Sequence, residues 1–337
     1  MLRGSRDGFV ETLVSNAALL RRRIRDPRFS MELYGVGRRS RSDVAICYIS
    51  DSVDQNILNR MRKLIQSIDV DALTMNIESL AECMFTHKWI NPFPKFKYSE
   101  RPDTATAAIL DGNIVIMVDN SPAVMIIPAS IFDIIEEADD FNFSPMIGSY
   151  LRITRFFFSI VTWILTPLWL LFVNNPDWVP EFMKFVLITD DITVPVLLQL
   201  LILELAVDGL KLAAVNTPTM LSTPLSIVAG IVVGEYAVSS GWFNPEALLY
   251  MAVVTVGTYG QTNFEMGYAF KFLRVITLIL TQVFNLGGFI TGVVISVLMI
   301  AFNRTITGKS YIYPLIPWDG KMLKRKVLRV RLPHSYK

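Results

Sequence analysis

The chain has 337 residues, of which 52% are hydrophobic and 18% are charged, and its mean hydropathy is +0.42. Soluble domains usually carry about a quarter of charged residues, so this composition excludes an ordinary soluble protein. The net charge of +2 conceals an uneven distribution, because residues 1–155 hold 19 Lys and Arg and 20 Asp and Glu, whereas residues 156–300 hold four and nine. We therefore expect a soluble domain over residues 1–150, a membrane domain over 151–303 and a basic tail over 304–337.

The soluble half alternates helix and strand patterns. Apolar residues recur at helical spacing in three segments and gather in short apolar runs in the others, where Asp111-Gly112 predicts a tight hairpin turn. The fold class expected is an α/β cytosolic domain followed by an α-helical multi-pass transmembrane domain. The predicted helices are 8–24, 52–68 and 77–85, and the predicted strands are 44–49, 105–110, 114–118 and 123–127.

This half carries no recognisable reaction chemistry. It has no Gly-rich phosphate loop, no CxxC pair and no HExxH motif, so we expect no enzyme, no catalytic residue, no metal and no cofactor. The basic run Arg21, Arg22 and Arg23 has two interpretations, contact with anionic lipid headgroups or with acidic residues of a neighbouring subunit. Because membrane segments follow, the run does not indicate nucleic acid as a partner.

Five hydrophobic blocks follow. A helix needs about 20 apolar residues to cross the hydrocarbon core. The block 192–203 has only 12 uncharged residues, which predicts an interfacial or re-entrant helix. The last block, with Asn285 and two glycines in its middle, is either one long tilted helix or a broken one. The other three blocks are 156–173, a helix that starts at about Thr223 and runs past Glu235, and 247–260.

The distribution of basic residues predicts an orientation. Residues 304–337 contain nine Lys and Arg and one acid, and basic loops usually face the cytoplasm. Both termini are then cytoplasmic, which requires an even number of crossings. Four spans with one interfacial helix is the simplest count, and six is the alternative. The same basic tail is expected to contact anionic lipids.

Three carboxylates lie where a membrane is expected. Glu235 is either a pore-lining, cation-attracting group or a carboxylate at the helix end, at the interface or paired with Lys211 or Arg274. Glu204 and Asp208 share a helix face and are candidates for an ion vestibule, with solvent exposure as the simpler interpretation. Close packing between helices, in one chain or between copies, is predicted at the spacing of Gly230 and Gly234.

Several ordered motifs resemble the A subunits of spore germinant receptors, the GerA family, and among them the stage V sporulation protein AF branch. The resemblance covers essentially the whole chain. It implies a cytosolic α/β domain and a multi-helix domain in the inner membrane of a bacterial endospore. The motifs are Asp7-Gly8-Phe9-Val10-Glu11, Leu20-Arg21-Arg22-Arg23, Glu100-Arg101-Pro102-Asp103, Asn216-Thr217-Pro218, Asn244-Pro245-Glu246 and Tyr313-Pro314-Leu315-Ile316-Pro317.

Members of the family are similar to ligand-gated channels assembled as rings, which release monovalent cations. The AF branch is expected to amplify that flux with a small membrane protein as partner. Two departures from the family pattern limit what the resemblance implies for this chain. The chain starts directly before the Gly8-Phe9 motif, where family members carry a further soluble subdomain, and Ala206-Val207-Asp208-Gly209 replaces the receptors' Leu-Arg-Glu-Ala.

Two functions from different classes follow from these observations. The first is a subunit of an oligomeric cation channel, with a pore lined by the helix from Thr223 to Tyr236. The alternative is a non-conducting scaffold or signalling subunit, in which the soluble half does the work. A secondary transporter ranks last, because the sequence contains no convincing internal repeat.

Overall fold

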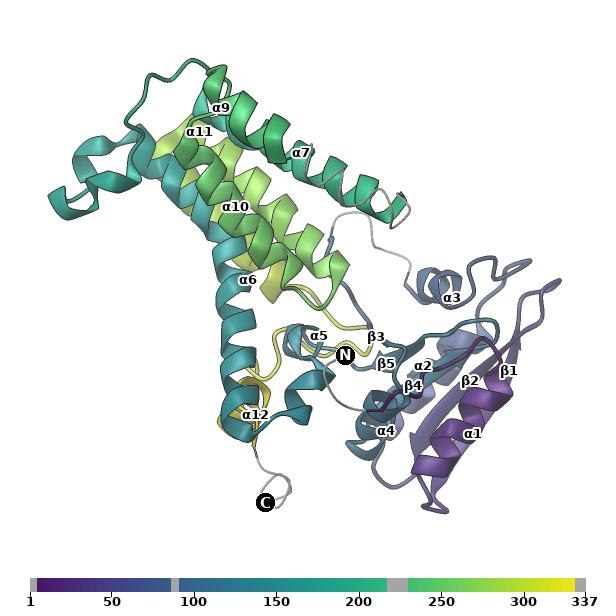
Figure 1. Ribbon diagram of the computed structural model, residues 1–337. Helices are drawn as coiled ribbons and strands as arrows, with labels where there is room; N and C mark the ends of the chain where they lie inside the picture. Colours follow the sequence, from purple (N-terminus) through teal and green to yellow (C-terminus); the bar gives the residue numbers. More distant parts are fainter. Residues whose placement is uncertain (1–4, 86–90, 217–229, 331–337) are drawn as a thin grey trace. The chain divides into compact units, whose positions relative to one another are not determined.

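The computed structural model describes residues 5–85, 91–216 and 230–330 of the chain (Figure 1). The chain forms two compact units, which are described separately below. The first unit contains Met1–Ile153 together with Ile300–Lys337, and the second contains Thr154–Met299. The C-terminal segment, which the sequence set apart as a tail, thus belongs to the first unit.

The first unit is built on a five-stranded antiparallel sheet. The strand order is β1-β2-β4-β5-β3, so β1 and β3 are the edges. Central strands are buried on both faces: every residue of β4 is buried. The strands are β1 (Phe29–Val36), β2 (Ser42–Ile49), β3 (Lys97–Ser99), β4 (Ile114–Val118) and β5 (Val124–Ile127).

Two hydrophobic clusters cover the two faces of this sheet. Alternate residues of one strand point to opposite faces. On β2, accordingly, Val44 and Ile46 join the cluster with α2 and α3, whereas Ala45 and Cys47 join the cluster with α1 and α4. The helices of this unit are α1 (Leu13–Arg23), α2 (Gln55–Gln66), α3 (Ile77–Met84), α4 (Pro102–Leu110), α5 (Ile131–Ile135), the 3₁₀ helix η1 (Ala138–Asn142) and α12 (Gly320–Val327).

The predicted strand 105–110 is wrong: these residues form the end of α4. Pro102 occupies the first turn of α4 and Asp103 adds an acid there, and both features favour a helix start. Asp111 and Gly112 therefore connect a helix to β4 and do not form a hairpin. Gly112 has φ +86°, and a Cβ there would lie 2.6 Å from the main-chain oxygen of Ser52, so the turn requires glycine.

The second unit is helical. The boundary between the units falls within the long helix α6, and a hydrophobic cluster around Trp169, Leu200 and Met251 joins α6, α7 and α10. The elements are α6 (Pro145–Asn174), the 3₁₀ helices η2 (Pro176–Trp178) and η3 (Glu181–Val186), α7 (Val196–Asn216), the π-helix η4 (Gly230–Tyr236), α9 (Ala237–Ser239), α10 (Pro245–Tyr259) and α11 (Phe264–Ala301).

Helix α7 is longer than the sequence indicated. The predicted block 192–203 stops where the charges begin, but the helix starts at Val196 and continues through Glu204 and Asp208 to Asn216. Both carboxylates have cationic partners on α11. The charges therefore do not end the helix.

Helix α11 is broken at Asn285, the second of the two predicted alternatives. Asn285 has φ 51° and ψ −129°, which interrupts the helix. The halves on either side fold back on each other, because a Cβ on Gly292 would lie 2.9 Å from the Cα of Thr277. By length and composition alone, α6 and the segment Phe264–Ala301 that contains the broken α11 are long and apolar enough to cross a membrane.

Candidate functional site

The helical unit contains a buried cluster of four charged side chains. Arg274 of α11 donates from Nε to Oε1 of Glu204 on α7 at 2.5 Å. A second nitrogen of Arg274 donates to the main-chain oxygen of Thr162 on α6. One guanidinium therefore connects three helices (α6, α7 and α11 in Figure 1).

Lys271 completes the cluster one helical turn earlier on α11. Its ammonium pairs with Asp208 and lies 3.5 Å from Oε2 of Glu204. It also donates to the main-chain oxygen of Glu204 at 3.1 Å. The charges of the two acids and two bases sum to zero. Such pairing lowers the energetic cost of keeping charged side chains in surroundings of low dielectric constant.

This arrangement changes the interpretation of two sequence candidates. The simpler expectation for Glu204, solvent exposure, is wrong, because the residue is only 4% exposed. A role of Glu204 and Asp208 as ion ligands stays a prediction. The pairs with Lys271 and Arg274 were missed because they join positions more than 60 residues apart, and no local signal reports such distances.

Glu235 differs from the paired carboxylates. It lies in η4, an exposed position, and within the described residues no ion pair includes it. The two cations proposed for it are engaged elsewhere: Arg274 holds Glu204, and Lys211 lies over the rings of Tyr259 and Tyr268. Since π-helical turns occur frequently at functional sites, Glu235 stays a candidate of the sequence analysis.

The helix around Glu235 has an open face. A Cβ built on Gly230 or on Gly234 meets no atom within 4 Å. The close packing predicted for this pair is therefore not made within the described part of this chain, and contact with another copy stays a prediction. Thr223, the predicted start of this helix, lies outside the described residues.

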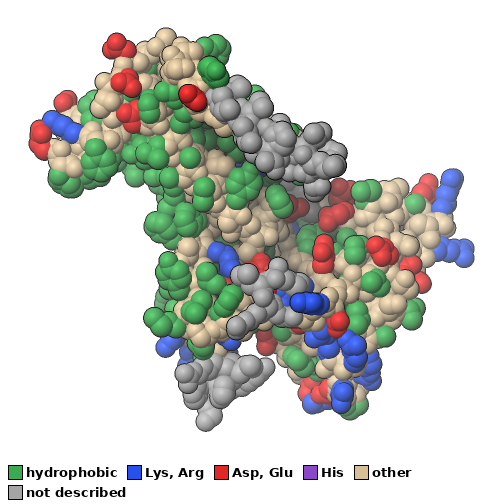
Figure 2. Space-filling model, viewed as in Figure 1, with side chains coloured by type: hydrophobic (Ala, Val, Ile, Leu, Met, Phe, Trp, Pro, Cys, Tyr) green, Lys and Arg blue, Asp and Glu red, His purple; other side chains and the backbone are tan. Residues whose placement is uncertain are grey.

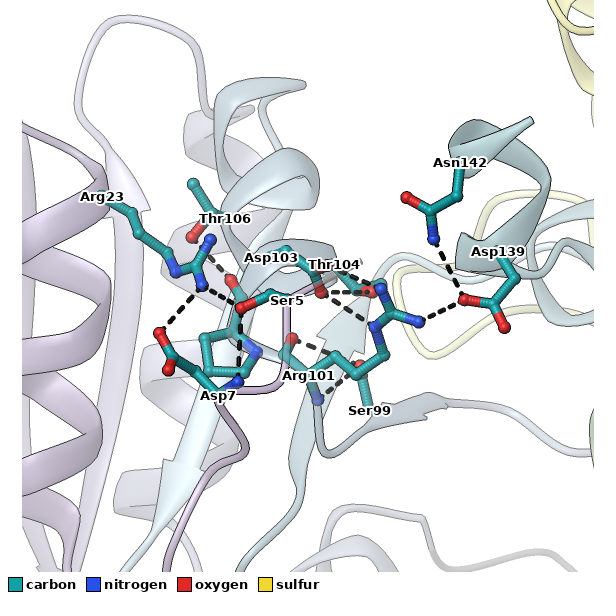
Figure 3. A network of polar contacts seen from close by, with 11 residues as sticks. Ser5, Asp7, Arg23, Ser99, Arg101, Asp103, Thr104, Thr106, Asp139 and Asn142 are labelled. Atoms are coloured by element: carbon teal, nitrogen blue, oxygen red, sulfur yellow. Dashed lines mark hydrogen bonds and ion pairs between the residues drawn. The ribbon is translucent and has the colours of Figure 1, made fainter. Parts of the chain in front are cut away.

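The basic run lies at the end of α1 and is largely engaged within the first unit. Arg22 pairs with Asp7 at 2.5 Å. Arg23 reaches both Ser5 and Asp7 (Figure 3). Arg21 donates to main-chain oxygens and lies over the Phe29 ring. Contact of these arginines with lipid or a neighbouring subunit stays a prediction.

Arg101 organises a second polar network in the first unit (Figure 3). Its guanidinium donates to both carboxylate oxygens of Asp103, at 3.0 and 2.7 Å, and to Asp139 at 2.6 Å. Arg101 follows β3 and Asp139 belongs to η1, so the side chain connects the sheet edge with η1. Among the described residues, no group of three or more His, Cys, Asp or Glu side chains could hold a metal ion.

Comparison with known proteins agrees with the motifs. The family described as Bacillus/Clostridium GerA spore germination protein matches residues 1–337. The chain belongs to this family. The family predicted from the sequence is therefore confirmed, and membership supports a role in spore germination.

Individual relatives extend the comparison. Stage V sporulation protein AF of Bacillus subtilis (strain 168) is 38% identical over 333 residues, which cover 99% of this chain and 67% of that protein. Spore germination protein GerLA of Bacillus cereus is 28% identical over 98% of this chain and 67% of its own length. The chain thus spans about two thirds of the length of these relatives.

A solved structure also matches part of the chain. It is the N-terminal domain of the A subunit of the Bacillus megaterium spore germinant receptor GerK3, with 31% identity. The match covers 36% of this chain and 94% of that one, with a TM-score of 0.29.

Proposed function

We propose that this chain is a subunit of an oligomeric cation channel in the spore inner membrane, which releases monovalent cations and amplifies the germination signal. Several copies surround a pore, with both termini of each copy in the cytoplasm, and a small membrane protein serves as partner. Membership in the GerA family supports the setting, spore germination.

The surface of the helical unit supports the membrane part of the proposal. Figure 2 shows hydrophobic side chains over much of its visible face. Large apolar residues of α6 and α11 are more than half exposed, among them Phe157 at 59% and Val283 at 64%. Only 17% of the most apolar window of α11 is buried. A core helix of a soluble protein would be mostly covered, so this exposed apolar surface supports coverage by lipid or by another subunit.

The single observation that carries the channel proposal is the position of Glu235. The buried carboxylate Glu204 and its neighbour Asp208 are neutralised inside the chain, whereas Glu235 is exposed on a helix with an open glycine face. Copies that meet along that face would bring several unpaired carboxylates together. A ring of carboxylates attracts cations and rejects anions.

Cation flux through liposomes tests the proposal. The full chain, with its partner added in a second series, is reconstituted beside Glu235→Gln and beside Glu181→Gln, an exposed control that pairs with Lys184. We expect flux that falls by about tenfold or more with Glu235→Gln and is unchanged with Glu181→Gln. Equal flux in all three proteins would remove Glu235 from the pore.

The charge cluster favours a second function, a non-conducting scaffold or signalling subunit. Its four charges neutralise one another and hold three helices together, which is a structural role and presents no free charge to an ion. An inserted, oligomeric chain without flux, with or without its partner, would support this second function.

A further inference from the structure

The first unit contains a cavity lined by charges of both signs. Its volume is about 230 Å³, below the roughly 300–1,000 Å³ of pockets for drug-sized ligands. The cavity therefore fits a smaller molecule. Its charged lining residues come from β3, α4, the turn after α4, α5 and the following residue, and α12; they are Lys97, Asp103, Asp111, Asp133, Glu136 and Lys326.

Most of these charges are already compensated inside the chain. Three carboxylates of the lining each form an ion pair with a basic side chain, and two of the three bases come from outside the lining. The pairs are Asp133 with Lys326, Glu136 with Arg152, and Asp103 with Arg101.

Two charges of opposite sign remain. The Lys97 ammonium donates to the main-chain oxygen of Glu136 at 3.0 Å, and within the described residues it has no ion pair. An ammonium has three donors, so two have no partner among the residues that the structure describes. Asp111 lies after the last turn of α4, and its carboxylate has no ion pair or hydrogen bond in the described part of the chain.

The pKa values of both groups point the same way. Burial lowers the pKa of Lys97. Asp111 is an exposed residue, and the pKa of its carboxylate is nevertheless raised, chiefly by partial desolvation, while Lys326 opposes the shift and Glu136 adds to it. Neither charge has an ion-pair partner in the described part of the chain, so a complementary group of a ligand would stabilise the charged form.

We propose that this cavity binds a small amine that also carries a hydrogen-bond acceptor, with the amine against Asp111 and the acceptor against Lys97. With its three ion pairs formed, the lining presents one carboxylate and one ammonium and no excess positive charge that would favour an anion. The remaining lining is largely short or apolar, including Ala107 and Phe141, and accommodates a few carbon atoms. The site lies within the first unit and does not depend on whether the second unit conducts ions.

Titration of the purified full chain in detergent with ethanolamine tests the proposal. This probe has one ammonium and one hydroxyl group. We expect saturable heat of binding that Asp111→Asn reduces by about tenfold, the loss of about 1.4 kcal/mol. Lys97→Met should weaken the binding of ethanolamine by a similar factor. It should leave the binding of ethylamine, which lacks the hydroxyl group, unchanged.

The controls separate the site from general charge effects. Asp69→Asn, at an exposed carboxylate outside the cavity, should bind ethanolamine like the parent chain, and Asp111→Asn should unfold at the parent temperature because it keeps shape and volume. If Lys97→Met does not fold, Asp111→Asn decides alone. Three outcomes would overturn the proposal: no saturable binding at millimolar ethanolamine, equal binding by Asp111→Asn, or tighter binding of acetate.

Discussion

Arg274 and Glu204 lie 70 positions apart in the chain and form an ion pair of 2.5 Å between two helices, and both side chains are at most 5% exposed. The guanidinium also reaches the main chain of α6 at Thr162. The pair is therefore a structural junction of the helical unit, because both side chains are too buried for water to solvate a charge that loses its partner.

Removal of one partner should destabilise this unit strongly. Glu204→Gln leaves Arg274 buried without its counter-charge, which costs about 3–5 kcal/mol in comparable pairs. We expect a markedly lower unfolding temperature for the full chain in detergent, measured by the loss of helical circular dichroism.

Two further variants check that interpretation. Replacing both partners, as Glu204→Gln with Arg274→Met, should recover much of the loss because no uncompensated charge remains. Glu181→Gln breaks the exposed pair with Lys184 and should change stability by less than about 1 kcal/mol. An unfolding temperature for Glu204→Gln equal to that of the parent would refute the junction.

Local patterns predicted most elements of the fold, and their failures have physical causes. The amphipathic α2 and the apolar β4 follow directly from residue spacing. Strand β1 was missed because it is an edge strand with polar residues such as Ser30 and Glu32 in its alternation. Helix α4 was read as a strand because its apolar run precedes Asp111-Gly112, a pair that fits a hairpin equally well.

The candidate site was predictable only in part. Glu235 stands out in an apolar block, so the sequence marks it as a candidate, and its role stays a prediction. The partners of Glu204 and Asp208 depend on how α7 packs against α11, and the cavity charges Lys97 and Lys326 lie more than 200 positions apart. Spacing along the chain carries no information on such contacts.

The hairpin within α11 predicts opposite effects at adjacent glycines. A Cβ at Gly288 would lie 1.8 Å from the main-chain oxygen of Leu280, whereas one at Gly287 meets nothing within 4 Å. Gly288→Ala should therefore cost about 3 kcal/mol or more, since backbone must move. Gly287→Ala should be neutral or stabilising by about 0.5–1 kcal/mol. The yield of folded protein after detergent extraction checks both, and similar yields would show that the halves do not pack this closely.

Replacement of Arg101 by lysine should destabilise the first unit. Its planar guanidinium contacts both oxygens of Asp103 and one of Asp139, and the side chain is 12% exposed. A lysine ammonium cannot reproduce this fork, so we expect Arg101→Lys to lose about 1.5–3 kcal/mol, the range for hydrogen bonds to charged groups.

The matched control for Arg101→Lys is Arg38→Lys. Arg38 makes the same two-pronged contact with Asp69, but both side chains are 68% exposed. Water replaces much of that contact, so the change should have little effect on stability. Denaturant unfolding measures the stability of both variants. Equal losses of stability would mean that burial does not distinguish the Arg101 contact from the Arg38 contact.

The first unit should lose stability in acid through Glu32. Hydrogen bonds from Arg62, Tyr48 and Tyr34 lower the pKa of Glu32 from 4.5 to about 2, with Arg62 the largest cause. Because the folded pKa lies below the unfolded value, the contribution of Glu32 to stability is fully present above about pH 4.5 and declines as the pH falls towards 2.

At pH 7, Glu32→Gln should be less stable than the parent chain by about 1–2 kcal/mol, which is the free energy of the pKa shift discounted for partial exposure. That difference should shrink between pH 5 and pH 2.5 in thermal unfolding of the two proteins. A difference that is constant over this range would show that the carboxylate charge contributes nothing to the network.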